Sequence, residues 1–248
     1  ITYLRVLLLK NNSMDDFRRL KDTFIEIFDK LGRKDTFNTV SIILNFCYKN
    51  YYMTGNEEMM KERMNVLKFA LYKGLYSFED NDHFDSQWFY NIFSTGLEIG
   101  ETKWTEEFLE KYSSKTEPEK ENFLVNMGKA MLCFNKGKFS DSLGYISRIK
   151  KISSSGDKFN VKIHQMRVYY ELKMFDQAES SADSFRHVLQ NDSIISEFNK
   201  ILYRNFYGFY NRLLGMNQKP GKKDNTKFRN ELLKTNNTFH KKWLLEKI

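Results

Sequence analysis

Proline and glycine are scarce in this chain, with two prolines and twelve glycines among 248 residues. Because proline breaks helices and interior glycine weakens them, their scarcity permits long, uninterrupted helices. Sustained alternation of polar and apolar residues between Asn-Gly or Asp-Gly turns is also missing, so nothing in the sequence indicates β-hairpins. These absences favour an all-α protein.

Long apolar runs and cysteine pairs are absent too. The apolar stretch at residues 3–10 contains Arg5 and falls well short of the roughly 20 residues that a membrane-spanning helix needs. Cys47 and Cys133 lie far apart within apolar helical patterns, which indicates buried thiols in a reducing compartment. We expect a cytoplasmic protein without a membrane span. Because the chain begins at Ile1 with the back half of a helix, we also expect it to be the C-terminal part of a longer protein.

Catalytic and metal-binding patterns are missing as well. The histidines are scattered, without His-x-x-x-His or Cys-x-x-Cys spacing, at positions His83, His164, His187 and His240. The acidic loop around Asp80, Asp82 and Asp85 lacks the glycine and glutamate that a calcium loop requires at its sixth and twelfth positions. The segment from Gly215 to Lys223 does not match a phosphate loop, because Lys223 replaces the required Ser or Thr. We therefore expect no enzyme, no metal and no cofactor.

The most informative feature that is present is a sequence pattern that occurs three times at a nearly constant spacing, called the echo below. Trp104, Phe139 and Phe175 each open a helix-like segment after a short turn, 35 and 36 residues apart. A period near 34 is typical of a helix–turn–helix repeat, because neither helix buries its apolar stripe without the next repeat stacked on it. Three residues after these aromatics come Glu107, Ser142 and Ala178.

The echo also predicts how neighbouring helices pack, through a small residue and a buried aromatic residue. Ala130, nine residues before Phe139, is small enough to let two helices approach closely. We expect the aromatic residue to be a buried anchor between neighbouring repeats, so that Phe139→Ala costs about 3–5 kcal/mol.

Apolar residues at helical spacing predict about twelve helices in antiparallel pairs, with an acidic connector at 77–85. The predicted helices are 2–10, Met14–Leu31, Thr36–Met53, Glu57–Tyr76, Trp88–Ile99, Trp104–Tyr112, Glu119–Asn135, Ser140–Ile152, Lys158–Lys173, Asp176–Gln190, Ile194–Leu214 and Lys227–Lys247. The expected fold is an all-α solenoid of stacked antiparallel helix pairs that forms a single domain over residues 1–248.

The echo resembles the tetratricopeptide-repeat superfamily. Gly137, Phe139 and Ser142, and again Phe175 and Ala178, stand where that family has its turn residue, its aromatic and its small residue. The Trp, Leu-Gly and closing Pro of the family pattern are absent, so these would be diverged repeats. The resemblance implies a superhelix of stacked helix pairs.

A second resemblance covers nearly the whole chain. It is carried by Lys49-Asn50-Tyr51-Tyr52, Gly55-Asn56-Glu57-Glu58, Asp183-Ser184-Phe185-Arg186 and the final Lys242-Trp243-Leu244-Leu245-Glu246-Lys247-Ile248. These segments are similar to a group of long, uncharacterised helical-repeat proteins from Bacteroidetes-type bacteria. The resemblance implies a fold and a cytoplasmic setting, and no activity or ligand residues.

Charge is distributed unevenly along the chain. Residues 1–124 hold 17 Lys+Arg against 21 Asp+Glu, whereas residues 125–248 hold 23 against 11. A basic patch is expected near the C-terminus, at Lys219, Lys222, Lys223, Lys227, Arg229, Lys234, Lys241 and Lys242. It is either a solvated polar face or a docking surface for an acidic protein, nucleic acid or membrane headgroups. The aromatic residues interleaved with it are more typical of a helical core than of base stacking.

Two functional hypotheses follow. In the first, a non-catalytic scaffold binds another protein or peptide on the concave face formed by the first helix of each pair. Its candidate groove residues are Tyr48, Tyr52, Asn126, Lys129, Gln165, Tyr169 and Arg204. In the second, the basic C-terminal helix pair binds nucleic acid.

Overall fold

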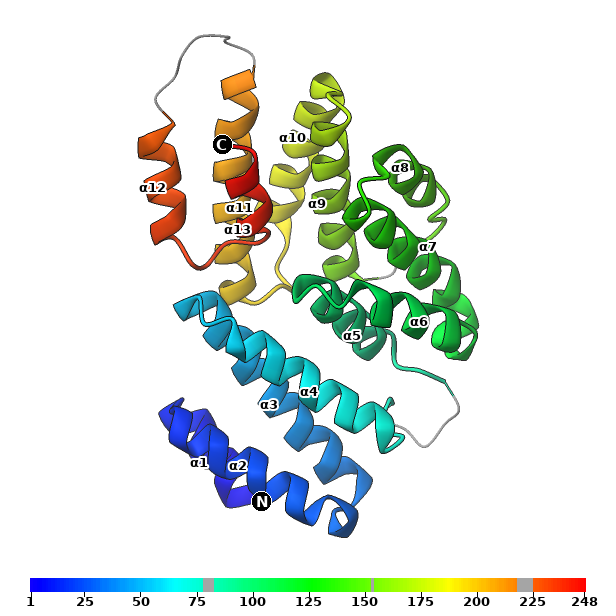
Figure 1. Cartoon of the computed structure of the whole chain (residues 1–248), viewed down its shortest axis with the longest axis vertical. Coiled ribbons are helices and arrows are strands. Elements are labelled where there is room, and N and C mark those ends of the chain that lie inside the picture. Colours follow the sequence, from blue (N-terminus) through cyan, green and yellow to red (C-terminus); the bar gives the residue numbers. More distant parts are fainter. Residues whose placement is uncertain (78–82, 153, 218–224) are drawn as a thin grey trace. The chain divides into compact units, whose positions relative to one another are not determined.

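The computed structural model is built from α-helices that follow one another along the chain (Figure 1). It describes residues 1–77, 83–152, 154–217 and 225–248. Within those ranges there are thirteen α-helices and two short 3₁₀ helices, and no β-strand beyond one isolated bridge between Phe84 and Thr116. The expected all-α class is therefore confirmed. The chain divides into two compact units, Ile1–Leu124 and Val125–Ile248. A single stacked array over the whole chain stays a prediction.

The first unit consists of sequential helices, each packed on its neighbour in the chain. Its elements are α1 (Thr2–Asn11), α2 (Met14–Ile27), η1 (Phe28–Lys30), α3 (Arg33–Thr54), α4 (Glu58–Tyr72), α5 (Ser86–Glu98), α6 (Thr102–Tyr112) and η2 (Ser113–Lys115). Helix α7 (Pro118–Asn135) begins in this unit and continues into the second.

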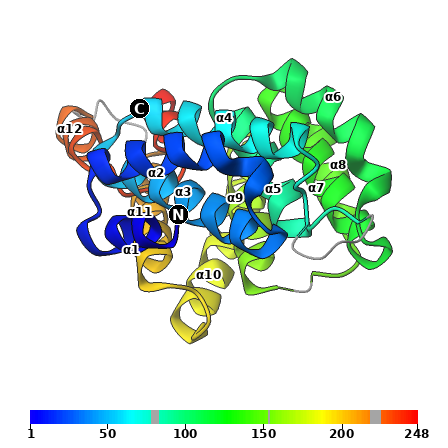
Figure 2. The same ribbon diagram turned by 90° about the horizontal axis from the view of Figure 1, so that it is seen from below.

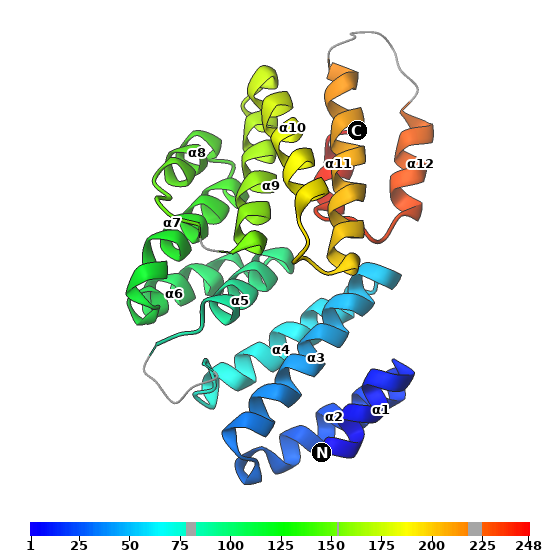
Figure 3. The same cartoon turned by 180° about the vertical axis from the view of Figure 1, so that it is seen from behind.

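The second unit has the same sequential organisation, and Figure 3 shows its neighbouring helices running antiparallel. Its further elements are α8 (Phe139–Ser147), α9 (Ser155–Glu171), α10 (Phe175–Asn191), α11 (Glu197–Asn217), α12 (Thr226–Lys234) and α13 (Lys241–Glu246). Helices α11 and α12 pack through Phe209 and Phe228, whose ring centroids lie 5.8 Å apart. The pairing of sequential helices is thus confirmed.

The echo seen in the sequence corresponds to a recurring helix end. Gly100, Gly137 and Lys173 adopt left-handed φ values of 83°, 72° and 57°. After each, the next backbone N–H donates to the carbonyl five residues earlier, at 2.8, 2.8 and 2.9 Å. This pattern is a Schellman end, which satisfies carbonyls that the helix leaves open. The three echo turns lie 37 and 36 residues apart. Gly74, with a φ of 74° and a bond from the Leu75 N–H to the Ala70 carbonyl at 2.9 Å, forms the same helix end outside that spacing.

In the first of the three echo segments, the small residue lies in a different register from the one predicted. Thr105, Ser142 and Ala178 each follow the turn by five residues, and each is 0% exposed. Glu107, expected in this role, is exposed instead. The prediction failed there because Trp104 is the third residue of α6, whereas Phe139 and Phe175 are the first residues of α8 and α10. The prediction for Ser142 and Ala178 is correct.

The expectation of a deeply buried aromatic anchor is wrong. Trp104, Phe139 and Phe175 are all only partly buried. The Phe139 ring packs on Phe134 at 5.2 Å, and the Phe175 ring packs on Tyr170 at 5.9 Å. Both contacts bridge the turn inside one helix pair. These two rings therefore close their own turns instead of filling a pocket between repeats.

Several predicted helix ends differ from the structure, and the largest difference lies in the last predicted helix. Instead of one helix over Lys227–Lys247, α12 ends at Lys234 and α13 begins at Lys241. The intervening Thr235-Asn236-Asn237-Thr238 favours turns, because its short polar side chains compete for backbone hydrogen bonds. The Thr235 hydroxyl indeed donates to the Glu231 carbonyl at 2.9 Å. Helices α4 and α8 likewise end earlier than predicted, at Tyr72 and Ser147.

The acidic connector is anchored at its end by Phe84. This side chain is 0% exposed and stacks on Tyr76 at 5.2 Å. Its backbone N–H donates to the Lys115 carbonyl at 2.6 Å. Residues 78–82, with Asp80 and Asp82, lie outside the described part of the chain.

Candidate functional site

The two groove candidates of the first unit belong to a tyrosine cluster on α3. Tyr52 is only 8% exposed, and its ring lies 4.9 Å from those of Tyr48 and Tyr51. Burial raises the pKa of Tyr48 and of Tyr52. Tyr48 is partly buried and faces the guanidinium of Arg63 at 5.3 Å. These side chains are placed as packing residues, and little of Tyr52 is open to a ligand.

Arg63 is a buried cation that the sequence analysis did not single out. It is 5% exposed, donates from Nη1 to the Leu44 carbonyl at 2.7 Å and from Nε to Thr95 Oγ1 at 3.1 Å. Burial lowers its pKa. Its bonds tie together α3, α4 and α5. A signal existed, because Arg63 falls on the apolar face of α4 with Met60 and Leu67.

The remaining groove candidates lie in the second unit and are accessible to different degrees. Asn126, Gln165 and Tyr169 are partly buried, whereas Lys129 and Arg204 are exposed. The Lys129 ammonium lies 5.8 Å from the ring of Tyr145. Arg204 Nη1 lies 3.9 Å from Glu197 Oε2. They come from the first helices α7, α9 and α11, as predicted.

Helix α9 presents a stripe of partly exposed residues. Lys158, Lys162, Gln165 and Tyr169 follow one another at spacings of four, three and four, and none of them is buried. Such spacing places them along one face of a helix. Lys162 Nζ donates to Ser184 Oγ on α10 at 2.7 Å. The stripe joins Gln165 and Tyr169 into one surface.

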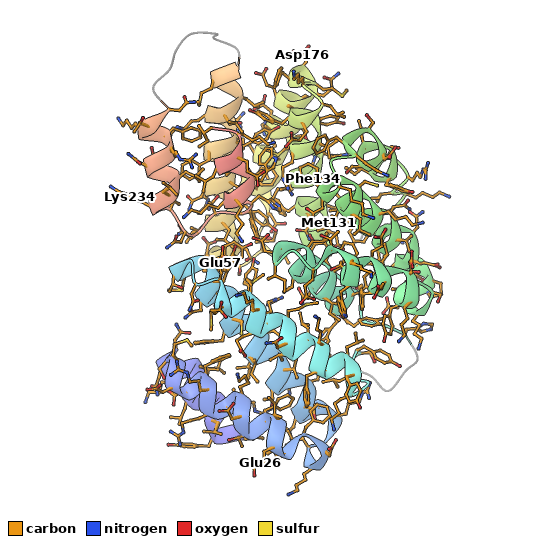
Figure 4. All side chains as sticks on the ribbon, viewed as in Figure 1. Glu26, Glu57, Met131, Phe134, Asp176 and Lys234 are labelled. Carbon is orange, nitrogen blue, oxygen red and sulfur yellow. The ribbon has the colours of Figure 1, made fainter. Side chains whose placement is uncertain are left out.

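The described part of the basic patch is mostly exposed. Lys227, Arg229, Lys234 and Lys242 are exposed, and Figure 4 shows Lys234 on the outer side of α12. Lys241 has a structural role instead, because its ammonium donates to the Leu233 carbonyl at 2.8 Å and to Asn236 Oδ1 at 3.0 Å. The remaining members, which lie outside the described residues, are Lys219, Lys222 and Lys223.

Most of the aromatic residues interleaved with the patch are in the core. Five are at most 7% exposed, namely Phe206, Phe209, Tyr210, Phe228 and Trp243. Tyr207 and Phe239 are partly buried. The basic residues thus lie on a surface over an aromatic core.

A buried hydroxyl–imidazole pair joins three helices of the second unit. Ser142 Oγ donates to the Ala130 carbonyl at 2.7 Å and lies 2.9 Å from His164 Nε2. Because the serine proton is committed to the carbonyl, the imidazole has to donate to the serine oxygen. A base that activates a serine nucleophile accepts the serine proton, which is the opposite polarity. With exposures of 0% and 4%, Ser142 and His164 form a structural link.

Next to this pair, Arg167 lies between two histidines. Its guanidinium is 4.1 Å from the Phe134 ring, and its Nη1 is 3.5 Å from His240 Nε2. Burial and the Arg167 charge lower the pKa of His164 to about 3. The same two causes, with a further contribution from His164, hold the pKa of His240 well below its usual value. Both imidazoles are therefore neutral at physiological pH.

The C-terminal helix α13 packs on α9 and α11. Figure 2 shows α10 and α13 on different sides of α11, and in Figure 3 α13 lies behind α11. Trp243 is 6% exposed, and its indole N–H donates to Glu171 Oε1 at 2.6 Å. Its ring meets Tyr170 of α9 at 5.5 Å and Tyr210 of α11 at 6.2 Å. The surface of α9 and α11 that faces away from α10 is therefore covered by α13. Sequence reasoning missed this site.

In the part of the chain that the structure describes, no three His, Cys, Asp or Glu side chains gather where they could hold a metal ion. None of the described helices combines the length and apolarity needed to cross a bilayer. No protein-family model matches the chain, and neither the curated proteins nor the solved structures contain a significant match.

Proposed function

We propose that this protein is a non-catalytic, tetratricopeptide-like helical scaffold that binds another protein or a peptide on the face formed by the first helix of each pair. The recurring Schellman turns and the buried small residues at Thr105, Ser142 and Ala178 support a repeat origin. Sequential packing of helices in both units supports stacking. Stacked helix pairs present their first helices along one binding surface.

One observation carries the proposal: the first helices α9 and α11 already hold a short helix, α13. It lies on the side of α9 that carries Tyr170 and Glu171, which is opposite to the side with Gln165 and Tyr169. Trp243 inserts a buried aromatic anchor between Tyr170 and Tyr210. Buried aromatic anchors with a polar handle carry much of the affinity at peptide-binding surfaces. A helix lying with its apolar side in a groove is also a common mode of peptide recognition.

A peptide-display screen on the full chain tests the proposal. Peptides selected on the wild-type protein should bind at least tenfold more weakly to a Lys129→Glu, Arg204→Glu variant, because both exposed cations belong to first helices. Arg186→Glu is the matched control, since Arg186 is exposed on second helix α10. Affinity that survives the double charge reversal, or that falls equally with Arg186→Glu, would contradict the proposed surface.

Nucleic-acid binding by the basic C-terminal helix pair is the second candidate. It is favoured by the exposure of Lys227, Arg229, Lys234 and Lys242. If six or more phosphates are contacted, affinity should fall roughly a thousandfold or more between 50 and 200 mM salt. A mobility-shift assay that detects no complex at low salt would remove this candidate.

A further inference from the structure

The segment after α12 contacts the second unit both before and within α13. Before the helix, Asn205 Nδ2 donates to the Asn237 carbonyl at 2.7 Å, and the Phe239 ring lies 4.9 Å from that of Tyr203. Helix α13 has six residues, and its buried members are Trp243 and Leu244. The preceding 235–240 is not helical, and His240 adopts a left-handed φ of 51°. A non-glycine residue in that conformation costs roughly 1–2 kcal/mol. Since an isolated helix of this length is not stable in water, α13 depends on the surface beneath it.

That surface offers three complementary features. Two tyrosine rings flank the indole of Trp243, and the Arg167 guanidinium lies 5.3 Å from its centroid. Glu171 accepts the indole N–H at 2.6 Å and, on the same oxygen, the Lys247 ammonium at 2.6 Å. Leu244, 1% exposed, fills an apolar position beside them. A ligand that fits this surface therefore needs an aromatic ring for the slot, a donor for the Glu171 carboxylate and an apolar side chain next to the ring.

We propose that the face of α9 and α11 beneath α13 is a docking site for a short partner helix that carries adjacent Trp and Leu residues and a lysine four positions after the Trp. The chain's own α13 occupies this site in cis, and the partner helix binds by displacing it. This inference rests on the proposed scaffold function and names its ligand chemistry and its built-in competitor.

The spacing of the anchors explains why a helix fits. Trp243 lies in α13 and Lys247 directly follows the helix, four residues later, so both side chains lie on one side and reach Glu171 together. The Glu171 carboxylate is 12% exposed, where an ion pair with a hydrogen bond is better shielded than on an open surface. A partner lacking the indole N–H would leave that carboxylate short of a donor.

Self-occupancy makes the site competitive. A tethered helix has an effective concentration in the millimolar range, so a free peptide of the same sequence competes poorly. Substitutions that remove the anchoring side chains of α13 should therefore leave the site open to a separate peptide with the wild-type α13 sequence. Local opening of such a segment requires less free energy than global unfolding.

The test uses a fluorescent peptide with the sequence of residues 238–248 and the full chain throughout. A Trp243→Ala, Leu244→Ala chain should bind the peptide, measured by anisotropy, at least tenfold more tightly than the wild-type chain does. A peptide in which alanine replaces the tryptophan should not bind. Equal binding by both chains, or no binding by a variant whose circular dichroism matches wild type, would overturn the proposal.

Three further variants separate loss of the site from misfolding. Trp243→Phe keeps an aromatic ring but loses the indole N–H, so its affinity for the peptide should fall between wild type and the double variant. Glu171→Gln in that background should weaken binding about tenfold, whereas Glu179→Gln, exposed on α10, should not. Equal effects of Glu171→Gln and Glu179→Gln, or binding by Trp243→Phe outside the range set by the other two chains, would overturn the site. If displayed peptides still bound through Lys129 and Arg204, the scaffold function would stand while this inference fell.

Discussion

Acid should destabilise the second unit through His164. The pKa of this imidazole is lowered to about 3, first by burial and second by the Arg167 charge, whereas in the unfolded chain it is about 6.5. Below pH 6.5 the His164 imidazole therefore binds a proton in the unfolded state but not in the folded state. The free energy of unfolding falls as the pH falls. Between pH 7 and pH 5 this loss amounts to about 2 kcal/mol. The loss continues down to the folded pKa.

Urea unfolding at pH 7, 6 and 5 measures the effect. Trp243 fluorescence reports on the second unit when Trp88 and Trp104 are replaced by Phe. His164→Gln should lower the free energy of unfolding by about 1–3 kcal/mol at pH 7, because Ser142 loses its buried hydrogen-bond partner. The loss of stability between pH 7 and pH 5 should shrink by about 2 kcal/mol. His187→Gln, at an exposed position of α10, should leave it unchanged. Equal pH dependence in wild type and His164→Gln would refute the reasoning.

Three stability predictions test the packing. A Cβ at Gly96 would collide with the Thr105 hydroxyl, whereas one at Gly144 meets nothing within 4 Å. Gly96→Ala should therefore lower the free energy of unfolding in urea by about 1–3 kcal/mol, whereas Gly144→Ala should raise it by up to about 1 kcal/mol. Equal effects of the two variants would contradict the close approach of Gly96 to Thr105. Because Phe139 is only partly buried, Phe139→Ala should cost about 1–2 kcal/mol, and a loss above 3 kcal/mol would restore the buried-anchor prediction. Arg63→Leu should cost about 2–3 kcal/mol by leaving buried acceptors unpaired, and an unchanged chemical-denaturation midpoint would contradict that role.

Local pattern was enough to predict most helices and the turns between them. Gly100 and Gly137 mark helix ends because glycine adopts positive φ without strain, which is visible in sequence. Lys173 adopts the same conformation without being glycine, so only its place in the echo predicts it. The register of Thr105 does not follow from the aromatic residue, because Trp104 is the third residue of α6 whereas Phe139 and Phe175 are first in their helices.

The site beneath α13 could not be predicted, because its contacts are non-local. Trp243 and Glu171 are 72 residues apart in the chain, and no helical period connects residues at that distance. The break before α13 did have a signal in Thr235-Asn236-Asn237-Thr238, but the apolar residues on both sides favoured a continuous helix. The exposed groove candidates, by contrast, follow from helical spacing alone.

The claim that the first helices carry the ligand is tested most directly by NMR. We expect a peptide selected on the full chain to shift the amide resonances of Gln165, Tyr169 and Arg204 on α9 and α11, while the exposed positions of α10 around Arg186 stay unchanged. Shifts confined to α10 or α12 would contradict the account.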